Sequence, residues 1–352
     1  MFLFLVMAAA LWGIGSLMRA PYRARFAMIG ALYVAVLLAH LVLPADNPLI
    51  LTLGGTFGGW LVLGGAGVLV YGYTRVLARL KAKKPDTKPA ATGTFSEVEL
   101  ERYARHIVLR EIGGPGQKKL KAAKVLVVGA GGLGSPALMY LAAAGVGTLG
   151  IIDDDVVDAS NLQRQIIHDD LDVGSSKAFS ASGRIADLNP FVAMRPYNRR
   201  LTEDIAAELF ADYDLILDGS DNFDTRYLVN RAAVETDTPL ISAAMAQYEG
   251  QISVFDPASG APCYQCVFPE APAAGLAPSC AEAGVLGPLP GVMGSLMAVE
   301  AIKLIAGAGE PLKGAMLIYD ALYADTRRIT VKPRADCPVC ATRRLQRAPD
   351  AP

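Results

Sequence analysis

Three apolar runs occupy the first 73 residues, and the hydrophobic pattern changes after them. The runs cover roughly residues 2–18, 26–43 and 49–73. Each is close to the ~17–25 residues that a helix needs to cross the hydrocarbon core of a bilayer. The pattern therefore predicts a three-span transmembrane anchor within residues 1–80.

Charged residues beside the runs set the predicted orientation of this anchor. Three arginines separate the first two runs, Asp46 lies between the second and third, and five basic residues follow the third. Because cytoplasmic flanks are enriched in Lys and Arg, we expect the N-terminus outside and the following domain in the cytoplasm. A cleaved signal peptide is the alternative for the first run, but it lacks a basic start and further apolar runs follow. The basic residues are Arg19, Arg23, Arg25, Arg75, Arg79, Lys81, Lys83 and Lys84.

The third run contains three pairs of adjacent glycines, at Gly54-Gly55, Gly58-Gly59 and Gly64-Gly65. Small residues of this kind let membrane helices pack closely, although the pattern is permissive and a simple tether is the plainer interpretation. His40 lies near the predicted outer end of the second run, where an interfacial residue is a plainer interpretation than a proton relay.

Residues 81–94 are rich in Lys, Pro, Ala and Thr without apolar periodicity, which is typical of a linker. A globular domain is predicted at 95–345, opening with the capping box Ser96-x-x-Glu99. Its apolar segments alternate between strand and helix, with a helix expected at Ser135–Ala144. This alternation predicts an α/β, doubly wound, Rossmann-like and mostly parallel sheet. The expected strands include Lys124–Val128, Leu149–Asp153 and Leu215–Asp218.

Composition narrows the class of protein. The chain has 352 residues, of which 52% are apolar, and that excess is concentrated at the N-terminus. A formal charge of −1 gives no reason to expect nucleic acid as a partner. Four of the five cysteines form two Cys-x-x-Cys pairs, whose spacing favours a tetrahedral metal site over a disulfide framework. Redox chemistry at one pair is the alternative. The pairs are Cys263/Cys266 and Cys337/Cys340.

A glycine loop, Gly129-Ala-Gly-Gly-Leu-Gly134, lies between the first predicted strand and helix. Backbone amides there can meet a phosphate at the start of a helix. Asp153 ends the next strand, where a carboxylate can accept a ribose hydroxyl. These features alone fit a nicotinamide-dependent dehydrogenase equally well. The glycines are Gly129, Gly131, Gly132 and Gly134.

Polar residues after Asp153 favour ATP over a dinucleotide. The glycine loop alone covers the pyrophosphate of a dinucleotide, which needs no further cations. A triphosphate that is attacked at its α-phosphorus needs cations to neutralise its charge. Asp221 follows another strand end and can hold magnesium together with phosphate oxygens. The polar residues are Asn161, Gln163, Arg164, Gln165 and Lys177.

The order and spacing of these motifs resemble the ThiF/MoeB/HesA family, the bacterial relatives of ubiquitin-activating enzymes. The resemblance covers roughly Phe95–Cys340 and includes four further segments. It implies ATP-dependent adenylation of the C-terminal glycine of a small ubiquitin-like sulfur carrier. The small subunit of molybdopterin synthase is the first expectation, and the thiamine-pathway carrier is the alternative. The segments are 152–165, 218–222, 249–251 and 283–294.

The resemblance also implies roles for individual residues. Asp153 would hold the ribose, and Arg164 and Lys177 would contact phosphates. Asp221, with Asn222 beside it, would organise magnesium. Asn161 and Gln165 would line the same pocket.

Further roles implied by the resemblance concern partners and metal. Arg105 matches an arginine that reaches ATP from a neighbouring subunit, which implies a homodimer. The four paired cysteines would hold structural zinc. Cys280 lies in Phe268–Leu289, a segment expected to form a crossover loop, where it is either an inert thiol or takes part in carrier transfer.

Only 12 residues of this sequence follow Cys340, so we expect no appended sulfurtransferase domain and a separate sulfur donor protein. Two other classes of function remain alternatives. A nicotinamide-dependent oxidoreductase would bind a dinucleotide, which the residues after Asp153 disfavour. A membrane docking protein with an inactive pocket would have no use for the retained charged residues.

Overall fold

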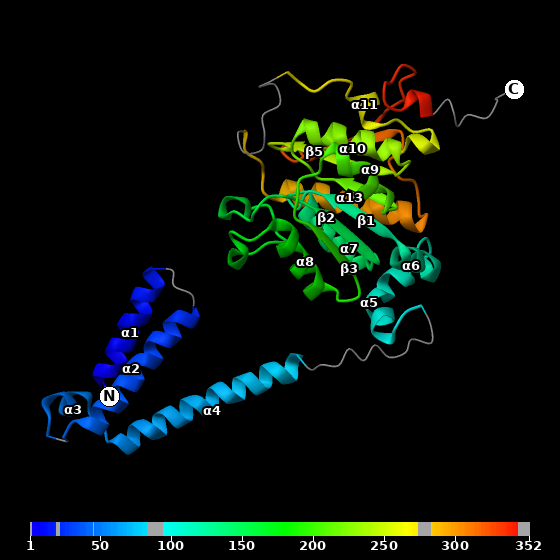
Figure 1. Ribbon diagram of the computed structural model, residues 1–352. Coiled ribbons are helices and arrows are strands. Elements are labelled where there is room, and N and C mark those ends of the chain that lie inside the picture. The colour runs from blue at the N-terminus through cyan, green and yellow to red at the C-terminus, as the bar shows by residue number, and fades with distance from the viewer. Residues whose placement is uncertain (1, 19–21, 45, 83–93, 274–282, 344–352) are drawn as a thin grey trace. The chain divides into compact units, whose positions relative to one another are not determined.

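The computed structural model describes residues 2–18, 22–44, 46–82, 94–273 and 283–343 (Figure 1). The chain divides into two compact units, Met1–Lys88 and Pro89–Pro352. Each unit has its own hydrophobic core.

The N-terminal unit is helical. The first two apolar runs form helices close to their predicted bounds, but the third does not form one continuous helix. A helix ends at Leu53, and the next two residues, Gly54 and Gly55, adopt positive φ angles of 66° and 85°. This conformation is strained for residues other than glycine, so the glycine pair ends one helix and permits another to begin. The helices are α1 (Phe2–Leu17), α2 (Tyr22–Val42), α3 (Pro48–Leu53) and α4 (Phe57–Ala82).

Trp60 anchors the core of this unit. Its side chain is 2% exposed, and its indole N–H donates to the carbonyl of Gly54 at 2.9 Å. Tyr33 on α2 donates its hydroxyl to the Trp60 carbonyl. A Cβ at Gly64 would come within 2.1 Å of the Tyr33 hydroxyl oxygen, so this glycine permits the close approach of α4 to α2.

By length and hydropathy, one described helix of the N-terminal unit could span a membrane. Among the described residues, only Ala24–Val42 and Pro288–Ala306 are long and apolar enough to cross a membrane. The second belongs to the other unit, where half of it is buried as a core helix. The apolar stretches of α1 and α4, Leu3–Leu17 and Phe57–Gly67, are shorter than a full span. The prediction of three full spans is therefore not met.

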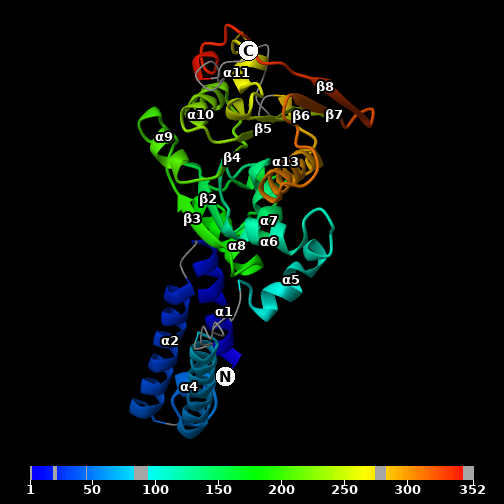
Figure 2. The ribbon, with the colours of Figure 1, turned by 90° about the vertical axis from the view of Figure 1, so that its right-hand side faces the viewer.

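The second unit contains one eight-stranded sheet in the order β3-β2-β1-β4-β5-β6-β7-β8. Strands β1 to β5 are parallel, whereas β6, β7 and β8 pair antiparallel at the end seen in Figure 2. The sheet is thus Rossmann-like but mixed. The strands are β1 (Lys124–Val128), β2 (Thr148–Ile152), β3 (Ala193–Tyr197), β4 (Leu215–Asp218), β5 (Leu240–Ala246), β6 (Glu249–Phe255), β7 (Ala315–Asp320) and β8 (Asp325–Thr330).

Helices cover both faces of the parallel strands. Alternate side chains of β1 belong to two different cores: Val125 and Val127 to one, Leu126 and Val128 to the other. Because both faces are buried, the strand is continuously apolar after the exposed Lys124. Helices α7 (Gly134–Ala144), α8 (Lys177–Leu188) and α13 (Pro288–Ala306) cover the first face, and α9 (Glu203–Ala211) and α10 (Phe223–Glu235) the second. The other described α-helices of this unit are α5 (Glu97–Ile107), α6 (Gly113–Ala122), whose Leu120 belongs to the first core, and the short α11 (Tyr264–Val267), whose Tyr264 belongs to the second.

The register of the central strands gathers three loops at one edge. Val128, the last residue of β1, pairs with Ile152 of β2 on one side and Asp218 of β4 on the other. The segments after these strands therefore leave the sheet side by side. Neighbouring strands are about 4.8 Å apart, so the loops after β2 and β4 are separated by roughly 10 Å.

Candidate active site

The glycine loop closes tightly between β1 and α7. Gly129 has φ of +93°, and a Cβ at Gly134 would lie 1.9 Å from the Gly129 carbonyl oxygen. A Cβ at Gly132 would approach Pro290 of α13 to 2.9 Å. Gly131 is less crowded, with the Gln165 amide nitrogen 3.7 Å away. Side chains at Gly132 and Gly134 would therefore clash with the protein itself, so glycine at these positions permits the loop to close at the start of α7, where backbone amides can meet an anionic ligand.

Asp153 braces this loop from the end of β2. One carboxylate oxygen accepts the Ala130 amide at 2.7 Å, and the other accepts the Asp155 amide at 2.8 Å. Burial raises the pKa of Asp153, while these two hydrogen bonds oppose the shift. Each oxygen keeps a second lone pair, so the carboxylate can still accept ribose hydroxyls.

Asn161 organises the polar segment that follows. Its side-chain oxygen accepts from Arg164 Nη2 at 2.9 Å and from Gln165 Nε2 at 3.2 Å. The Gln165 side chain is 4% exposed, yet its Oε1 has no hydrogen-bond partner among the described residues. A buried acceptor without a partner is costly, so a donor supplied by a ligand would fit here.

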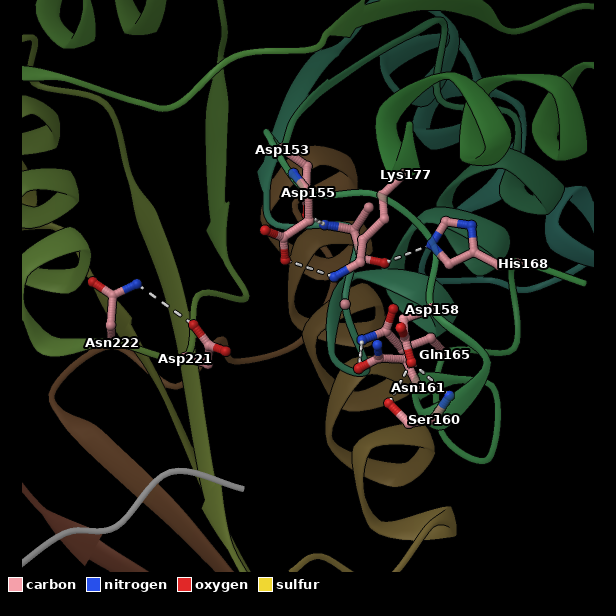
Figure 3. Close-up of polar contacts among 12 residues, drawn as sticks. Asp153, Asp155, Asp158, Ser160, Asn161, Gln165, His168, Lys177, Asp221 and Asn222 are labelled. Carbon is pink, nitrogen blue, oxygen red and sulfur yellow. Dashed lines mark hydrogen bonds and ion pairs between the residues drawn. The ribbon is translucent and has the colours of Figure 1, made fainter. Parts of the chain in front are cut away.

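Lys177 opens α8 and points into the same group (Figure 3). Its ammonium lies 2.8 Å from Asp155 Oδ2, and the two side chains are 7% and 67% exposed. The backbone amide of Lys177 also donates to the Asp155 carbonyl at 3.0 Å. Sequence reasoning missed Asp155, because nothing in its neighbourhood distinguishes it from the adjacent exposed Asp154.

Asp221 and Asn222 lie across from this group, after β4 (Figure 3). Both are exposed, and Asn222 caps α10 by accepting the Thr225 amide at 2.9 Å. The loop before them is held by a buried ion pair in which Arg226 lies 3.3 Å from Asp218. The pair fixes where Asp221 emerges, and no sequence signal had marked Arg226.

The four paired cysteines lie close together next to Val234 of α10, and all four are buried. A zinc ion with sulfurs about 2.3 Å away has sulfur–sulfur edges of about 3.8 Å. The separations are 3.8 Å for Cys263–Cys266, 3.6 Å for Cys263–Cys337 and 3.4 Å for Cys266–Cys340. Contacts with the neighbouring thiols and burial raise the pKa of Cys263. A metal cation reverses that penalty, so the donor set fits zinc.

Two predicted residues lie apart from this site. Arg105 is exposed on α5 and lines a surface depression of about 450 Å³ with Tyr140, Val299 and other residues of α5, α7 and α13. Tyr140 lies on the half of α7 remote from the glycine loop. Cys280 lies outside the described residues, although the segment after it resumes beside the site, where a Cβ at Gly287 would come within 2.5 Å of Gln163 Oε1.

Known proteins are similar to this chain in sequence. The ThiF family model matches residues 103–339. A sulfur carrier protein adenylyltransferase from Thermus thermophilus is 50% identical over 257 residues, which cover 72% of this chain and 95% of that protein. A probable adenylyltransferase/sulfurtransferase, MoeZ, from Mycobacterium tuberculosis is 52% identical over 251 residues, 70% of this chain and 64% of its own length. A SAMP-activating enzyme E1 from Haloferax volcanii is 47% identical over 249 residues, 71% of this chain and 92% of that protein.

Solved structures share the fold at lower identity. Escherichia coli MccB in complex with MccA-N7isoASN superposes with a TM-score of 0.61 at 23% identity, covering 68% of this chain and 74% of that one. The structure named PaaA gives 0.59 at 24% identity, with coverage of 74% and 81%. The family match, which covers more than half of the chain, and the relatives near 50% identity establish that this chain belongs to the ThiF family.

Proposed function

We propose that this protein uses ATP to adenylate the C-terminal glycine of a small ubiquitin-like sulfur carrier. The observation that carries the proposal is the 50% identity to a sulfur carrier protein adenylyltransferase over 95% of that protein's length. The convergence of the glycine loop, Asp153, Arg164 and Lys177 at one edge of the sheet supports it.

The glycine loop and Asp153 fit a nucleoside phosphate. Four of the six loop residues are glycines that leave their backbone uncovered, and each carboxylate oxygen of Asp153 keeps a lone pair for a ribose hydroxyl. Gln165 Oε1 adds an acceptor whose partner is absent among the described residues. These groups orient the nucleotide so that its α-phosphorus faces the incoming carboxylate.

Adenylyl transfer requires charge neutralisation rather than a nucleophile from the enzyme. An oxygen of the carrier's terminal carboxylate bonds to the α-phosphorus, the bond from that phosphorus to the bridging oxygen breaks, and pyrophosphate leaves. The product is an acyl-adenylate. Arg164, oriented by Asn161, and Lys177, held by Asp155, are the cations placed to stabilise the charge that develops.

Asp221 is the carboxylate that we assign to magnesium. It is exposed beside Asn222, and one carboxylate together with phosphate oxygens and waters satisfies this ion. Bound there, magnesium would neutralise the departing pyrophosphate. The neighbouring Asp153–Asp155 group is a second set of carboxylates close enough to hold a metal.

Zinc at the four cysteines serves structure in this proposal. The cluster joins the segment after β6 to the end of the described domain, with Val234 of α10 packed against it. No acid, base or phosphate-binding residue of the site contacts it among the described residues. The role that we assign to zinc is therefore to stabilise the fold.

A homodimer accounts for the position of Arg105. Tyr140 and Ala143, which line the same depression, lie six and nine residues beyond Gly134 on α7. At 1.5 Å per residue, this puts the depression on the order of 10 Å from the glycine loop of its own chain. We therefore assign Arg105 to the ATP of a partner chain docked over α5, α7 and α13, rather than to the ATP of its own chain. Mixing Arg105→Ala with Lys177→Met protein should restore activity if sites are shared, and no recovery from the mixture would reject sharing.

The N-terminal unit attaches the enzyme to a membrane in this proposal. Side chains on α1, α2 and α4 expose apolar surface, including Leu5, Ile14, Leu38, Val62 and Leu69. The basic residues after the third apolar run favour a cytoplasmic catalytic domain and an outside N-terminus. Flotation of the full chain with membranes, lost on deletion of residues 1–80, tests the attachment.

The carrier is the molybdopterin synthase small subunit or its thiamine-pathway counterpart, with sulfur supplied by a separate protein. The test is ATP–pyrophosphate exchange by the full-length protein in detergent, with each carrier added in turn. Exchange that requires one carrier and its terminal glycine supports adenylation and selects the pathway. ATP binding without exchange for any carrier would favour an inactive docking protein. Binding of a nicotinamide dinucleotide in place of ATP would favour an oxidoreductase.

A further inference from the structure

His168 is buried between the glycine loop and α8, and the proposed chemistry does not use it. Its side chain is 6% exposed. Nε2 lies 3.1 Å from the carbonyl oxygen of Ala130, and Nδ1 lies 2.7 Å from Ser180 Oγ. Because Asp153 accepts the amide of the same Ala130, His168 and Asp153 hold the loop from two sides (Figure 3).

The partners of the ring determine which nitrogen carries a proton. A carbonyl oxygen only accepts hydrogen bonds, so Nε2 of His168 donates to Ala130. In the neutral ring Nδ1 is an acceptor, and the single hydroxyl proton of Ser180 has two acceptors, Nδ1 and Asp172 Oδ2, each 2.7 Å from Ser180 Oγ. The neutral tautomer with its proton on Nε2 therefore satisfies the Ala130 carbonyl, while Nδ1 and the Asp172 carboxylate compete for the Ser180 proton.

Charged groups face the ring from three elements. Lys177 comes from α8, Asp172 from the 3-10 helix Asp170–Asp172, and Asp153 from the end of β2. Burial is the largest influence and lowers the pKa of His168; Lys177 acts in the same direction, whereas the Ala130 hydrogen bond and both aspartates oppose it. The neutral ring is thus favoured at physiological pH.

Ser180 connects His168 to the helix that supplies a phosphate-binding cation. It lies one turn beyond Lys177 on α8, and its Oγ is also 2.7 Å from Asp172 Oδ2. The imidazole is therefore fixed on the α8 side while it holds the loop on the other. Ala130 itself is fully buried. The hydroxyl of Ser135 is also near, but its Oγ lies 3.5 Å from the Ala130 carbonyl oxygen and 2.7 Å from that of Gly131, so it donates better to Gly131.

We propose that His168 is a positioning residue for the nucleotide: its Nε2–H sets the conformation of the glycine loop through the Ala130 carbonyl, while Ser180 fixes the ring. The consequence for ATP rests on the proposed function. Loss of the donor leaves a buried carbonyl unsatisfied until the loop shifts. We expect ATP to bind about 10- to 100-fold more weakly in its absence.

Two substitutions separate the ring nitrogens. In His168→Gln the side-chain amide can reach the position of Nε2 and keep the donor to Ala130. In His168→Asn the shorter amide reaches only the position of Nδ1 and keeps the contact to Ser180. A matched third variant, Ser180→Ala, keeps the histidine and removes the contact that orients it.

The experiment uses the full-length protein in detergent and two readouts. Hydrogen exchange of the ligand-free protein compares the peptide containing Gly129–Leu133 with a reference peptide from α10. Titration with ATP gives the dissociation constant. We expect His168→Asn to speed exchange in the loop but not in α10 and to weaken ATP binding, Ser180→Ala to do so less, and His168→Gln to stay within about threefold of the parent for ATP.

The outcomes separate this inference from the proposed function. Equal behaviour of the Gln and Asn variants, or faster exchange in both peptides alike, would overturn the assignment of His168. If the parent protein binds no ATP but loop exchange still differs between the two variants, the assignment stands and the proposed function fails. Should His168→Asn not fold, the comparison of His168→Gln with Ser180→Ala decides in the same way.

Discussion

Replacing Lys177 with Met should separate catalysis from stability. The ammonium of Lys177 is 7% exposed, whereas its partner Asp155 is 67% exposed and 2.8 Å away. Breaking a buried ion pair is most destabilising when the remaining charge is buried. Here the remaining carboxylate is hydrated, so we expect the free energy of unfolding to change by no more than about 1 kcal/mol.

The expected effect on catalysis is much larger. An ammonium about 4 Å from a phosphate oxygen, at an effective dielectric constant near 20, contributes about 4 kcal/mol. If this interaction is made with the charge that develops during transfer, its loss slows adenylation by roughly three orders of magnitude. The reverse perturbation, Asp155→Asn, leaves the buried ammonium unpaired and should destabilise the protein more than Lys177→Met does.

Two assays on the same preparations check this prediction. ATP–pyrophosphate exchange in the presence of carrier reports adenylation, and thermal unfolding reports stability. A change of 1 kcal/mol corresponds to a melting shift of roughly 2–4 °C for a domain of this size. Exchange by Lys177→Met within tenfold of the parent would refute the role of the ammonium. A melting temperature lowered by ten degrees or more, with exchange lost in parallel, would refute the separation of the two effects.

Three further predictions concern the loop, the metal and pH. Gly134→Ala should abolish ATP binding in titrations, because its Cβ would lie 1.9 Å from the Gly129 carbonyl oxygen. Cys340→Ser should lower bound zinc in elemental analysis and reduce the melting temperature, and unchanged zinc content would contradict the metal site. Burial lowers the pKa of His168 below 6.5, so its stabilising contribution is present above pH 6.5 and is lost as pH falls through the folded value. Acidification from pH 7.5 to 5 should therefore lower the melting temperature more in the parent than in His168→Gln.

Local sequence signals predicted the parts of the site that depend on strand ends. The capping box at Ser96 and Glu99 forms with both reciprocal hydrogen bonds. The glycine loop lies between a strand and a helix, and Asp153 directly follows β2, because βα units place their turns at the same sheet edge. These features depend on residues close together in the chain.

Long-range contacts were not predictable in this way. Asp155 meets Lys177 from 22 residues away, and His168 meets Ala130 from 38 residues away. Neither pairing leaves a periodic signal in the chain. The antiparallel end of the sheet was missed for a related reason, since β8 is exposed along its whole length and lacks an apolar pattern.

The break between α3 and α4 shows a different limit. Glycine carries no charge and no polar side chain, so the third apolar run appeared continuous. The structural signals were Pro48 after Asn47 at the start of α3, and Gly54-Gly55 at its end. These residues favour a cap and a turn, and they override hydropathy because backbone conformation rather than apolarity ends a helix.

The most direct test of adenylyl transfer is the mass of the carrier after incubation with the full-length protein, ATP and magnesium. The account predicts an intact carrier that gains one AMP at its terminal glycine while one pyrophosphate is released, and no gain when that glycine is removed. A carrier mass that stays unchanged for every candidate, under conditions in which the protein binds ATP, would contradict it.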